Sequence, residues 1–406
     1  MLAQRQQPTR RGRLGPVLFL AHFSWLLPML TSLTLLQALL AQVDARTKVA
    51  HYATLTIIGG AAATLANVVF GALSDRTRSR YGRRNPWILG GGLAAAAWVS
   101  AMSFVHDFTA LVALWLGFQI SLNAFLGPLI AVLPDRVRPA DLGKISSWVG
   151  AGQLLAQSLS GVIAGLFLAV PALGLRWVPW ILAAGAVLVF FLAPDRPNKH
   201  EPRGVFFSAA LVKCLLPPRD ADFAWALVGR FFALLSLFVV LLYQLYTLTD
   251  YLGLSTSAAA KVIATGGIVT AVASGTGNVV VGPLSDWLRR RKVIVIAAAL
   301  LMGAAAVPLA VSPSLWAFYG FAVLGGLGYG AYSAVDQALM AEVLPNEDHR
   351  AKDLGILNLA NTAPQIAAPL IALAVLPAFG FPGLFTLAAV SAMAGALCIK
   401  LIRRVR

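Results

Sequence analysis

Long apolar runs alternate with short polar segments along the whole chain. A helix needs about 20 apolar residues to cross a bilayer core of about 30 Å. The runs of roughly this length are 17–41, 53–74, 86–105, 108–131, 145–170, 176–193, 225–249, 259–284, 293–310, 314–341, 354–377 and 381–402. The pattern therefore predicts an all-α membrane protein with twelve transmembrane helices.

Composition supports this prediction. The chain is 59% hydrophobic and 12% charged, with a mean hydropathy of +0.77, whereas a soluble domain carries roughly 25% charged residues. The first apolar run is not followed by a small-residue cleavage site, so we expect it to be retained as a span. Cys214 and Cys398 form neither a disulfide framework nor a metal-ligand pattern.

The positive charges lie between the apolar runs. The net charge is +16, and 27 of the 32 Lys and Arg residues fall in the two tails and in alternate loops; four fall on the opposite side, and Arg230 lies inside a span. Because Lys and Arg accumulate in cytoplasmic loops, we expect a multi-pass protein of the cell membrane with both termini in the cytoplasm. We also expect contact with anionic lipids and no nucleic-acid partner, since no binding motif surrounds the charges.

The chain repeats itself at an offset of 211 residues. Gly71-Ala72-Leu73-Ser74-Asp75 recurs as Gly282-Pro283-Leu284-Ser285-Asp286, and Val132-Leu133-Pro134 recurs as Val343-Leu344-Pro345. Both pairs occupy the same place relative to their spans. The repeat predicts two similar six-helix halves, 1–193 and 225–406, joined by a cytoplasmic linker over 194–224.

The first copy of the repeat opens an arginine-rich loop over 71–88. We expect Gly71 to allow a close helix approach and Asp75 to pair with a cation or cap a neighbouring helix. A simpler alternative is that the loop arginines only set the topology. The candidate gating residues are Gly71, Asp75, Arg76, Gly82, Arg83, Arg84, Gly282 and Asp286.

This loop resembles the signature of the major facilitator superfamily. Its longer form, together with Thr249-Asp250-Tyr251-Leu252-Gly253, is similar to the sucrose-transporter branch of the glycoside–pentoside–hexuronide cation symporters. The resemblance implies a substrate site near the midplane between two bundles, lined by spans one, four, seven and ten. In melibiose-type members, aspartates on spans two and four hold sodium. Span two of this chain has no acid before Asp75, and span four has Gln119 and Asn123 in place of aspartates. A sodium site of that type is therefore not expected.

Ionisable residues inside spans are the strongest functional candidates, because each costs about 3 kcal/mol or more at depth. Arg230 in span seven and Asp336 in span ten lie at similar depth, roughly 12–13 Å from the ends of their spans. We expect them to pair. The pair either exchanges its partner for a proton or a solute during transport, or is a static link between two helices.

Polar and aromatic side chains extend this candidate cavity. Tyr329 and Tyr332 share a helix face with Asp336, an arrangement that suits a sugar, although tyrosines in spans also serve as packing groups. The remaining candidates are His22, Gln37, Gln119, Asn123 and Gln244. Hydrogen bonding between helices is the alternative role for these amides, and Asn361 and Gln365 are expected to join helices in this way.

The sequence favours a secondary active transporter that moves a small polar solute, such as a sugar or glycoside, by alternating access with proton coupling. The alternative is an exporter of drugs or metabolites. A membrane enzyme is not expected, because catalytic ligand clusters and a Gly-Lys-Ser/Thr phosphate loop are missing from the sequence. We expect no cofactor, no metal and a monomeric protein.

Overall fold

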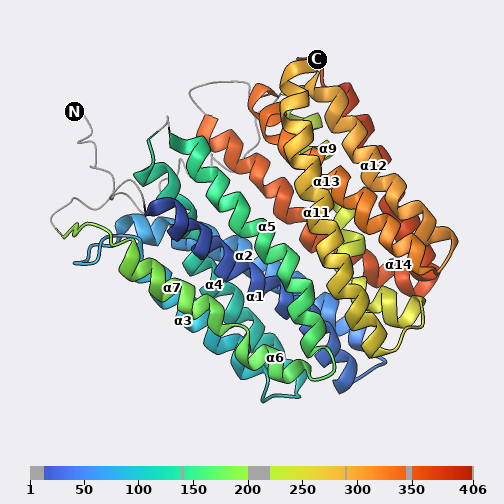
Figure 1. Ribbon diagram of the computed structural model, residues 1–406, viewed down its shortest axis with the longest axis horizontal. Coiled ribbons are helices and arrows are strands. Elements are labelled where there is room, and N and C mark those ends of the chain that lie inside the picture. Colours follow the sequence, from blue (N-terminus) through green and yellow to red (C-terminus); the bar gives the residue numbers. More distant parts are fainter. Residues whose placement is uncertain (1–12, 139–140, 200–219, 289, 344–349, 405–406) are drawn as a thin grey trace. The chain divides into compact units, whose positions relative to one another are not determined.

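The computed structural model describes residues 13–138, 141–199, 220–288, 290–343 and 350–404 (Figure 1). Every regular element within these ranges is a helix. The prediction of an all-α protein is therefore confirmed.

The chain divides into two compact units. Unit 1 comprises Met1–Val43 and Ile58–Phe206, and unit 2 comprises Asp44–Ile57 and Phe207–Arg406. The segment Asp44–Ile57, which the sequence assigned to the first half, thus groups with unit 2. Much of the linker predicted over 194–224 lies outside the described residues, so its role remains a prediction.

The first group of helices runs from the N-terminus to the end of the sixth span. The helices are α1 (Leu14–Val43), α2 (Lys48–Arg76), α3 (Asn85–Met102), α4 (Phe108–Arg136), α5 (Leu142–Phe167), α6 (Pro171–Trp177) and α7 (Trp180–Leu192). In unit 1, α1 packs on α5, and α3 packs on α4 and α7 (Figure 1). The Asp107 carboxylate begins α4 by accepting the N–H of Ala110 at 2.8 Å, which satisfies one of the free donors of the first turn.

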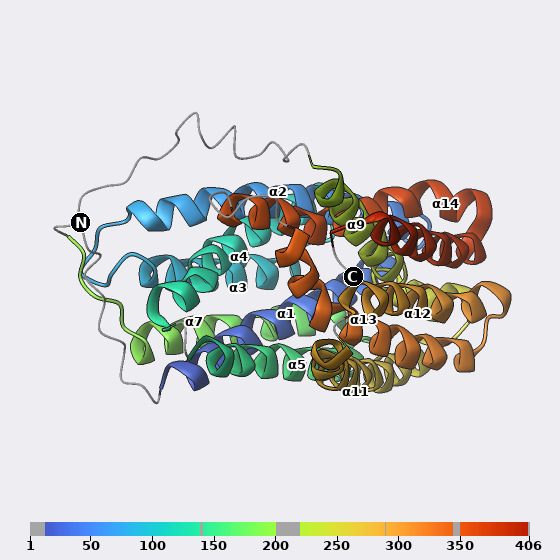
Figure 2. The same ribbon diagram turned by 90° about the horizontal axis from the view of Figure 1, so that it is seen from above.

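The second group of helices belongs to unit 2. They are α9 (Ala221–Leu241), α10 (Gln244–Tyr246), the π-helix η2 (Thr247–Tyr251), α11 (Thr256–Leu288), α12 (Arg291–Val311), α13 (Leu315–Val343) and α14 (Arg350–Leu401). Here α9 packs on α14, and α13 packs on α11 and α12; Figure 2 shows these helices from above. Asp220 caps α9 by accepting the N–H of Phe223 at 3.0 Å.

The twelve predicted spans are accounted for by these helices. Among the described residues, nine helices are long and apolar enough to cross a membrane. The last of them, α14, carries two predicted spans, which separate at Gly380 with φ +63°. The helices α3 and α13 match the two remaining spans, 86–105 and 314–341.

Two spans expected as single helices are interrupted. The span 176–193 is formed by α6 and α7, which meet at Val178–Pro179, where the proline ring cannot continue the hydrogen-bond ladder. The span 225–249 is formed by α9, α10 and η2, because the chain tightens at Leu242–Tyr243 and then widens into π-helical turns.

Glycines let the helices of each unit approach closely, as small residues do in membrane helix pairs. In unit 2 a Cβ on Gly277 would lie 2.5 Å from the Leu327 carbonyl oxygen, and a Cβ on Gly330 would collide with the Ser274 carbonyl. In unit 1 the corresponding contact is made by Gly127, whose added Cβ would lie 3.2 Å from the Gly71 nitrogen.

The close approach expected of Gly71 itself is therefore corrected. A Cβ on Gly71 would meet nothing within 4 Å, whereas one on Gly127 would press against the α2 backbone. The approach of α2 and α4 depends on the glycine of α4, since α2 presents its backbone, not its Cβ position, to that contact.

Replacing Gly330 with Ala should destabilise unit 2, because the added methyl group meets backbone that cannot move aside. We expect a loss of about 1–3 kcal/mol, typical of overpacking, seen as a lower thermal unfolding temperature in detergent. Gly320→Ala on the same helix, where a Cβ meets nothing within 4 Å, is the control. Equal effects of the two substitutions would contradict this account.

Candidate functional site

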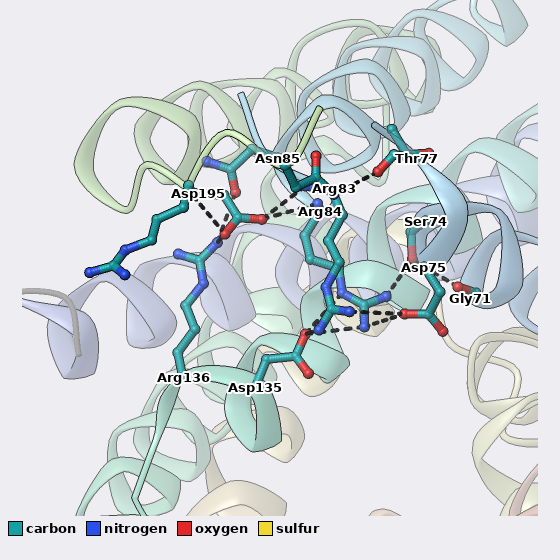
Figure 3. Close-up of polar contacts among 12 residues, drawn as sticks. Gly71, Ser74, Asp75, Thr77, Arg83, Arg84, Asn85, Asp135, Arg136 and Asp195 are labelled. Carbon is teal, nitrogen blue, oxygen red and sulfur yellow. Dashed lines mark hydrogen bonds and ion pairs between the residues drawn. The ribbon is translucent and has the colours of Figure 1, made fainter. Parts of the chain in front are cut away.

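A charged cluster surrounds the loop between α2 and α3 in unit 1 (Figure 3). Asp75, near the end of α2, pairs with Arg84 at 2.6 Å and lies 4.0 Å from Arg83. The Asp75 side chain is 56% exposed, while that of Arg84 is 6% exposed. The Arg84 Nη1 also donates to the Ser74 hydroxyl. The predicted pairing of Asp75 with a cation is thus present.

A second carboxylate faces the same two arginines from α4. Asp135 Oδ2 lies 2.7 Å from Arg83 Nη2 and 3.1 Å from Arg84 Nη2 (Figure 3). Two guanidinium groups therefore lie between two carboxylates, which cancels the local charge. Asp135 was not a candidate from the sequence. The available signal was its place directly after the repeated Val132-Leu133-Pro134 segment.

A third carboxylate reaches the loop from the chain that follows α7. Asp195 Oδ2 accepts the backbone N–H groups of Arg83 at 3.1 Å and Arg84 at 3.3 Å, and Oδ1 pairs with Arg136 at 3.2 Å. The helix α3 has no capping side chain of its own at Arg84. Asp195 supplies the missing acceptor and places negative charge at the N-terminus of the helix.

Gly82 is required by this contact for two reasons. Its φ of +81° lies in the left-handed region, which favours glycine. A Cβ at this position would also collide with the Asp195 side chain. Gly82 therefore allows the loop to turn and lets Asp195 reach the backbone of the next two residues.

Asn198 extends the attachment between the chain after α7 and the loop. Its amide oxygen accepts the Ser79 N–H at 3.0 Å, and its amide nitrogen donates to the Thr77 carbonyl at 2.9 Å. Thr77 in turn accepts the indole N–H of Trp87 at 2.7 Å. The loop is thus held on both sides by side-chain hydrogen bonds. Neither Asn198 nor Asp195 was a candidate from the sequence.

The other gating candidates contribute less to this cluster. Arg76 is half-buried at the end of α2. In unit 2, Gly282 is half-buried, and a Cβ there would lie 4.0 Å from the Ala334 methyl group. The Asp286 side chain lies outside the described part of the structure.

The second candidate site is a buried ion pair inside unit 2. Arg230 Nε on α9 lies 3.2 Å from Asp336 Oδ2 on α13, with side chains 9% and 3% exposed. The same Nε donates to the Asn361 amide oxygen on α14 at 2.8 Å. The predicted meeting of Arg230 and Asp336 is present, and Asn361, expected only to join helices, is part of the site.

The second oxygen of the Asp336 carboxylate is not engaged by the arginine. Asp336 Oδ1 is buried and makes no hydrogen bond of ordinary geometry with the described residues. The Tyr332 ring, 2% exposed, lies beside it, and Tyr329 is half-buried one turn earlier on α13. The site therefore combines a neutralised ion pair with a second carboxylate oxygen that lies beside the Tyr332 phenol.

The remaining candidates lie in the spans as follows. On α4, Asn123 donates to the Gln119 carbonyl at 2.9 Å, and its own amide oxygen accepts from Asn67 of α2 at 3.1 Å. This contact is the helix-joining role given as the alternative. On α1, His22 Nδ1 lies 2.9 Å from the Leu18 carbonyl oxygen. The other two are Gln37, which is buried on α1, and Gln244, which is half-buried in α10.

Among the described residues, no group of three or more His, Cys, Asp or Glu side chains is placed to hold a metal ion. Both candidate sites instead consist of arginines matched to carboxylates. One lies at a helix-end loop and the other within spanning helices. This is the arrangement of a polytopic membrane protein whose charges are neutralised internally.

The chain belongs to the Major Facilitator Superfamily. The family profile matches residues 14–276 and 267–406, and so covers nearly the whole sequence. No curated protein sequence matches the chain significantly.

Solved structures share its fold at low sequence identity. A mutant of the nucleoside transporter NupG is similar with a TM-score of 0.75 at 14% identity, over 96% of this chain and 99% of NupG. A POT family transporter in complex with 5-aminolevulinic acid gives 0.76 at 12% identity, over 97% and 96%. A bacterial homologue of the human lysosomal transporter Spinster gives 0.58 at 16% identity, over 95% of each chain.

Asp195→Ala should destabilise unit 1 more than Asp195→Asn. Both substitutions remove the carboxylate that faces Arg136. The amide oxygen of Asn can still accept the backbone N–H groups of Arg83 and Arg84, whereas Ala also removes this cap. A lost cap costs about 1 kcal/mol, so we expect two separable decreases in thermal stability. Equal stability of the Ala variant and the wild type would show that the cap is dispensable.

Proposed function

We propose that this protein is a secondary active transporter that moves a small, neutral, polyhydroxylated solute by alternating access, coupled to protons. The observation that carries the proposal is the buried Arg230–Asp336 ion pair, with its third partner Asn361. Membership of the superfamily supports the general class, and the geometry of this pair supports the finer assignment.

Energetic considerations favour a functional role for the Arg230–Asp336 pair over a stabilising one. Charged side chains at depth are expensive in a bilayer, and an apolar pair of similar volume is often at least as stable as a buried salt bridge. Breaking such a pair by removing one partner costs about 3–5 kcal/mol. A protein that retains both charges inside its spans therefore gains something other than stability from them.

The geometry supplies a route for proton coupling. A proton that binds Asp336 would remove the charge that faces Arg230, and Arg230 would keep its hydrogen bond to Asn361. The arginine would thus not be left without a partner when the carboxyl group is neutral. We propose that this exchange couples proton binding to the transport cycle.

The same site supports a neutral solute with hydroxyl groups. The charges of Arg230 and Asp336 already satisfy one another, so a charged solute would find no free counter-ion there. Asp336 Oδ1, which the arginine does not engage, can accept a hydrogen bond from a solute hydroxyl, and the Tyr332 ring can pack against a C–H face. The resemblance of the loop and of Thr249–Gly253 to the sucrose-transporter branch favours a sugar or glycoside.

Orientation completes the proposal. The arginine-rich loop between α2 and α3 would face the cytoplasm together with both termini, because Lys and Arg accumulate on that side of a cell membrane. The exposed cations there would contact anionic headgroups. We propose that a single copy of the chain is sufficient for transport.

Uptake into proteoliposomes tests the function directly. A panel of mono- and disaccharides, with and without an imposed pH gradient, should reveal accumulation of at least one neutral polyhydroxylated solute above protein-free liposomes. Nucleosides, peptides and drug-like cations in the same panel test the exporter alternative through competition. Uptake of charged solutes alone would contradict the proposed class.

Asp336→Asn should abolish accumulation driven by a pH gradient, since an amide cannot take up the coupling proton. Exchange of solute without a gradient should continue, because the amide oxygen can still face Arg230. Asp107→Asn, in the loop between α3 and α4, is the control and should retain both activities, because its amide oxygen can still accept the Ala110 N–H. Undiminished pH-driven uptake by the Asp336 variant would assign the ion pair a purely structural role.

A further inference from the structure

Three hydroxyl groups on span seven are buried without a hydrogen-bond partner among the described residues. They are the side chains of Ser236, Tyr243 and Thr247, with exposures of 1%, 0% and 0%. Serine and threonine inside helices usually bond to a carbonyl three or four residues earlier. Thr56 and Ser274 in the same unit make this bond. Ser236 and Thr247 do not make it.

The three hydroxyl groups follow one another along span seven. Ser236 lies in α9, which ends at Leu241, whereas Tyr243 and Thr247 lie beyond that end and are four residues apart, on one face. The Thr247 N–H donates to the Tyr243 carbonyl at 2.8 Å, which places these two residues one turn apart. We call Ser236, Tyr243 and Thr247 the hydroxyl row.

The backbone around the row is irregular. The Tyr243 N–H donates to the Val240 carbonyl three residues earlier, and the Leu252 N–H donates to the Thr247 carbonyl five residues earlier. The second bond belongs to the π-helix Thr247–Tyr251. Short π-helical segments interrupt helices frequently at functional sites. The departure from regular geometry therefore coincides with the unpartnered hydroxyl groups.

Aromatic rings adjoin the row. The Tyr243 ring lies edge-on to Tyr52, with centroids 5.7 Å apart, and 6.3 Å from Tyr246. All three tyrosine side chains are completely buried. The first turns of α2, which carry Tyr52 and group with unit 2, therefore cover this part of span seven.

An ion pair holds this covering segment in place. Lys48 Nζ lies 2.8 Å from Asp250 Oδ1, which also accepts the Thr249 hydroxyl at 2.8 Å. The Lys48 ammonium lies 5.1 Å from the centre of the Tyr246 ring. The two side chains are 15% and 30% exposed, so both charges of the pair are accessible to solvent.

We propose that Ser236, Tyr243 and Thr247 bind the hydroxyl groups of the solute, and that the segment Asp44–Ile57 covers the row at Tyr243 in the conformation described. The inference rests on the proposed function and adds a second set of solute contacts, on a different element from Asp336. Buried hydroxyl groups without partners are costly. They are retained because they find partners on the solute when the cover opens.

The row favours a neutral polyhydroxylated solute over a charged one. Each hydroxyl can donate and accept, which matches the hydroxyl groups of a sugar, and the tyrosine rings can pack on its C–H faces. The charges beside this covering segment, Lys48 and Asp250, already neutralise one another. A charged solute would therefore gain no counter-ion here.

The test removes the hydroxyl groups with the least change in shape, through Ser236→Ala, Tyr243→Phe and Thr247→Val, singly and together. The saccharide that the wild type transports best is the probe. Each substitution should raise its KM about five-fold, which is the loss of affinity expected when one neutral hydrogen bond is removed. The triple variant should lose most of its discrimination between that saccharide and its deoxy analogues. Thr276→Val, whose hydroxyl already bonds to the Val272 carbonyl, should leave KM unchanged.

Thermal stability in detergent separates this role from a structural one. Because the three hydroxyl groups have no partner among the described residues, their removal should leave the unfolding temperature unchanged or raise it while KM rises. A lower unfolding temperature with unchanged KM would overturn the inference.

Failure of the proposed function and failure of the hydroxyl row give different results. If the wild type accumulates no polyhydroxylated solute, the proposed solute class fails. If the wild type accumulates one and the triple variant keeps the same KM and the same deoxy discrimination, only the hydroxyl row fails.

Discussion

Buried charges in this protein neutralise one another, and their pairing determines which helices lie side by side. A bilayer offers no water to solvate a lone ion or an unpaired backbone group, so each buried charge needs a partner from another helix. Arg230 meets Asp336 inside unit 2, and Arg84 lies between Asp75 and Asp135 at the helix ends of unit 1. These pairs fix which helices are neighbours, since each joins different elements of the chain.

The sequence was sufficient for the spans and for one ion pair between them. Apolar run length located the spans, and equal depth indicated that Arg230 and Asp336 would meet. The sequence was insufficient for partners that lie in the polar segments between spans. Asp195 caps α3 from more than 100 residues away, and nothing in its local composition distinguishes it from an ordinary charged residue after a span.

Local backbone geometry was the second feature that the sequence did not predict. The span 225–249 reads as one continuous helix because its residues are mostly apolar, yet it tightens near Tyr243 and becomes π-helical from Thr247. No proline or glycine marks the change. A similar limit applied to Gly71. Its glycine indicated a close helix approach, but the sequence could not show that the glycine required at this contact is Gly127 of α4.

Polar groups in these spans thus separate into two kinds by their partners. Asn123 bonds within α4 and to Asn67 of α2, so it stabilises one arrangement of its bundle and would lose hydrogen bonds if a solute took its place. Tyr243 and Thr247 lose nothing by binding a solute, because no described residue satisfies their hydroxyl groups. A solute site that must form and disperse in each cycle is better built from groups of the second kind, since its occupied state then competes with no protein hydrogen bond.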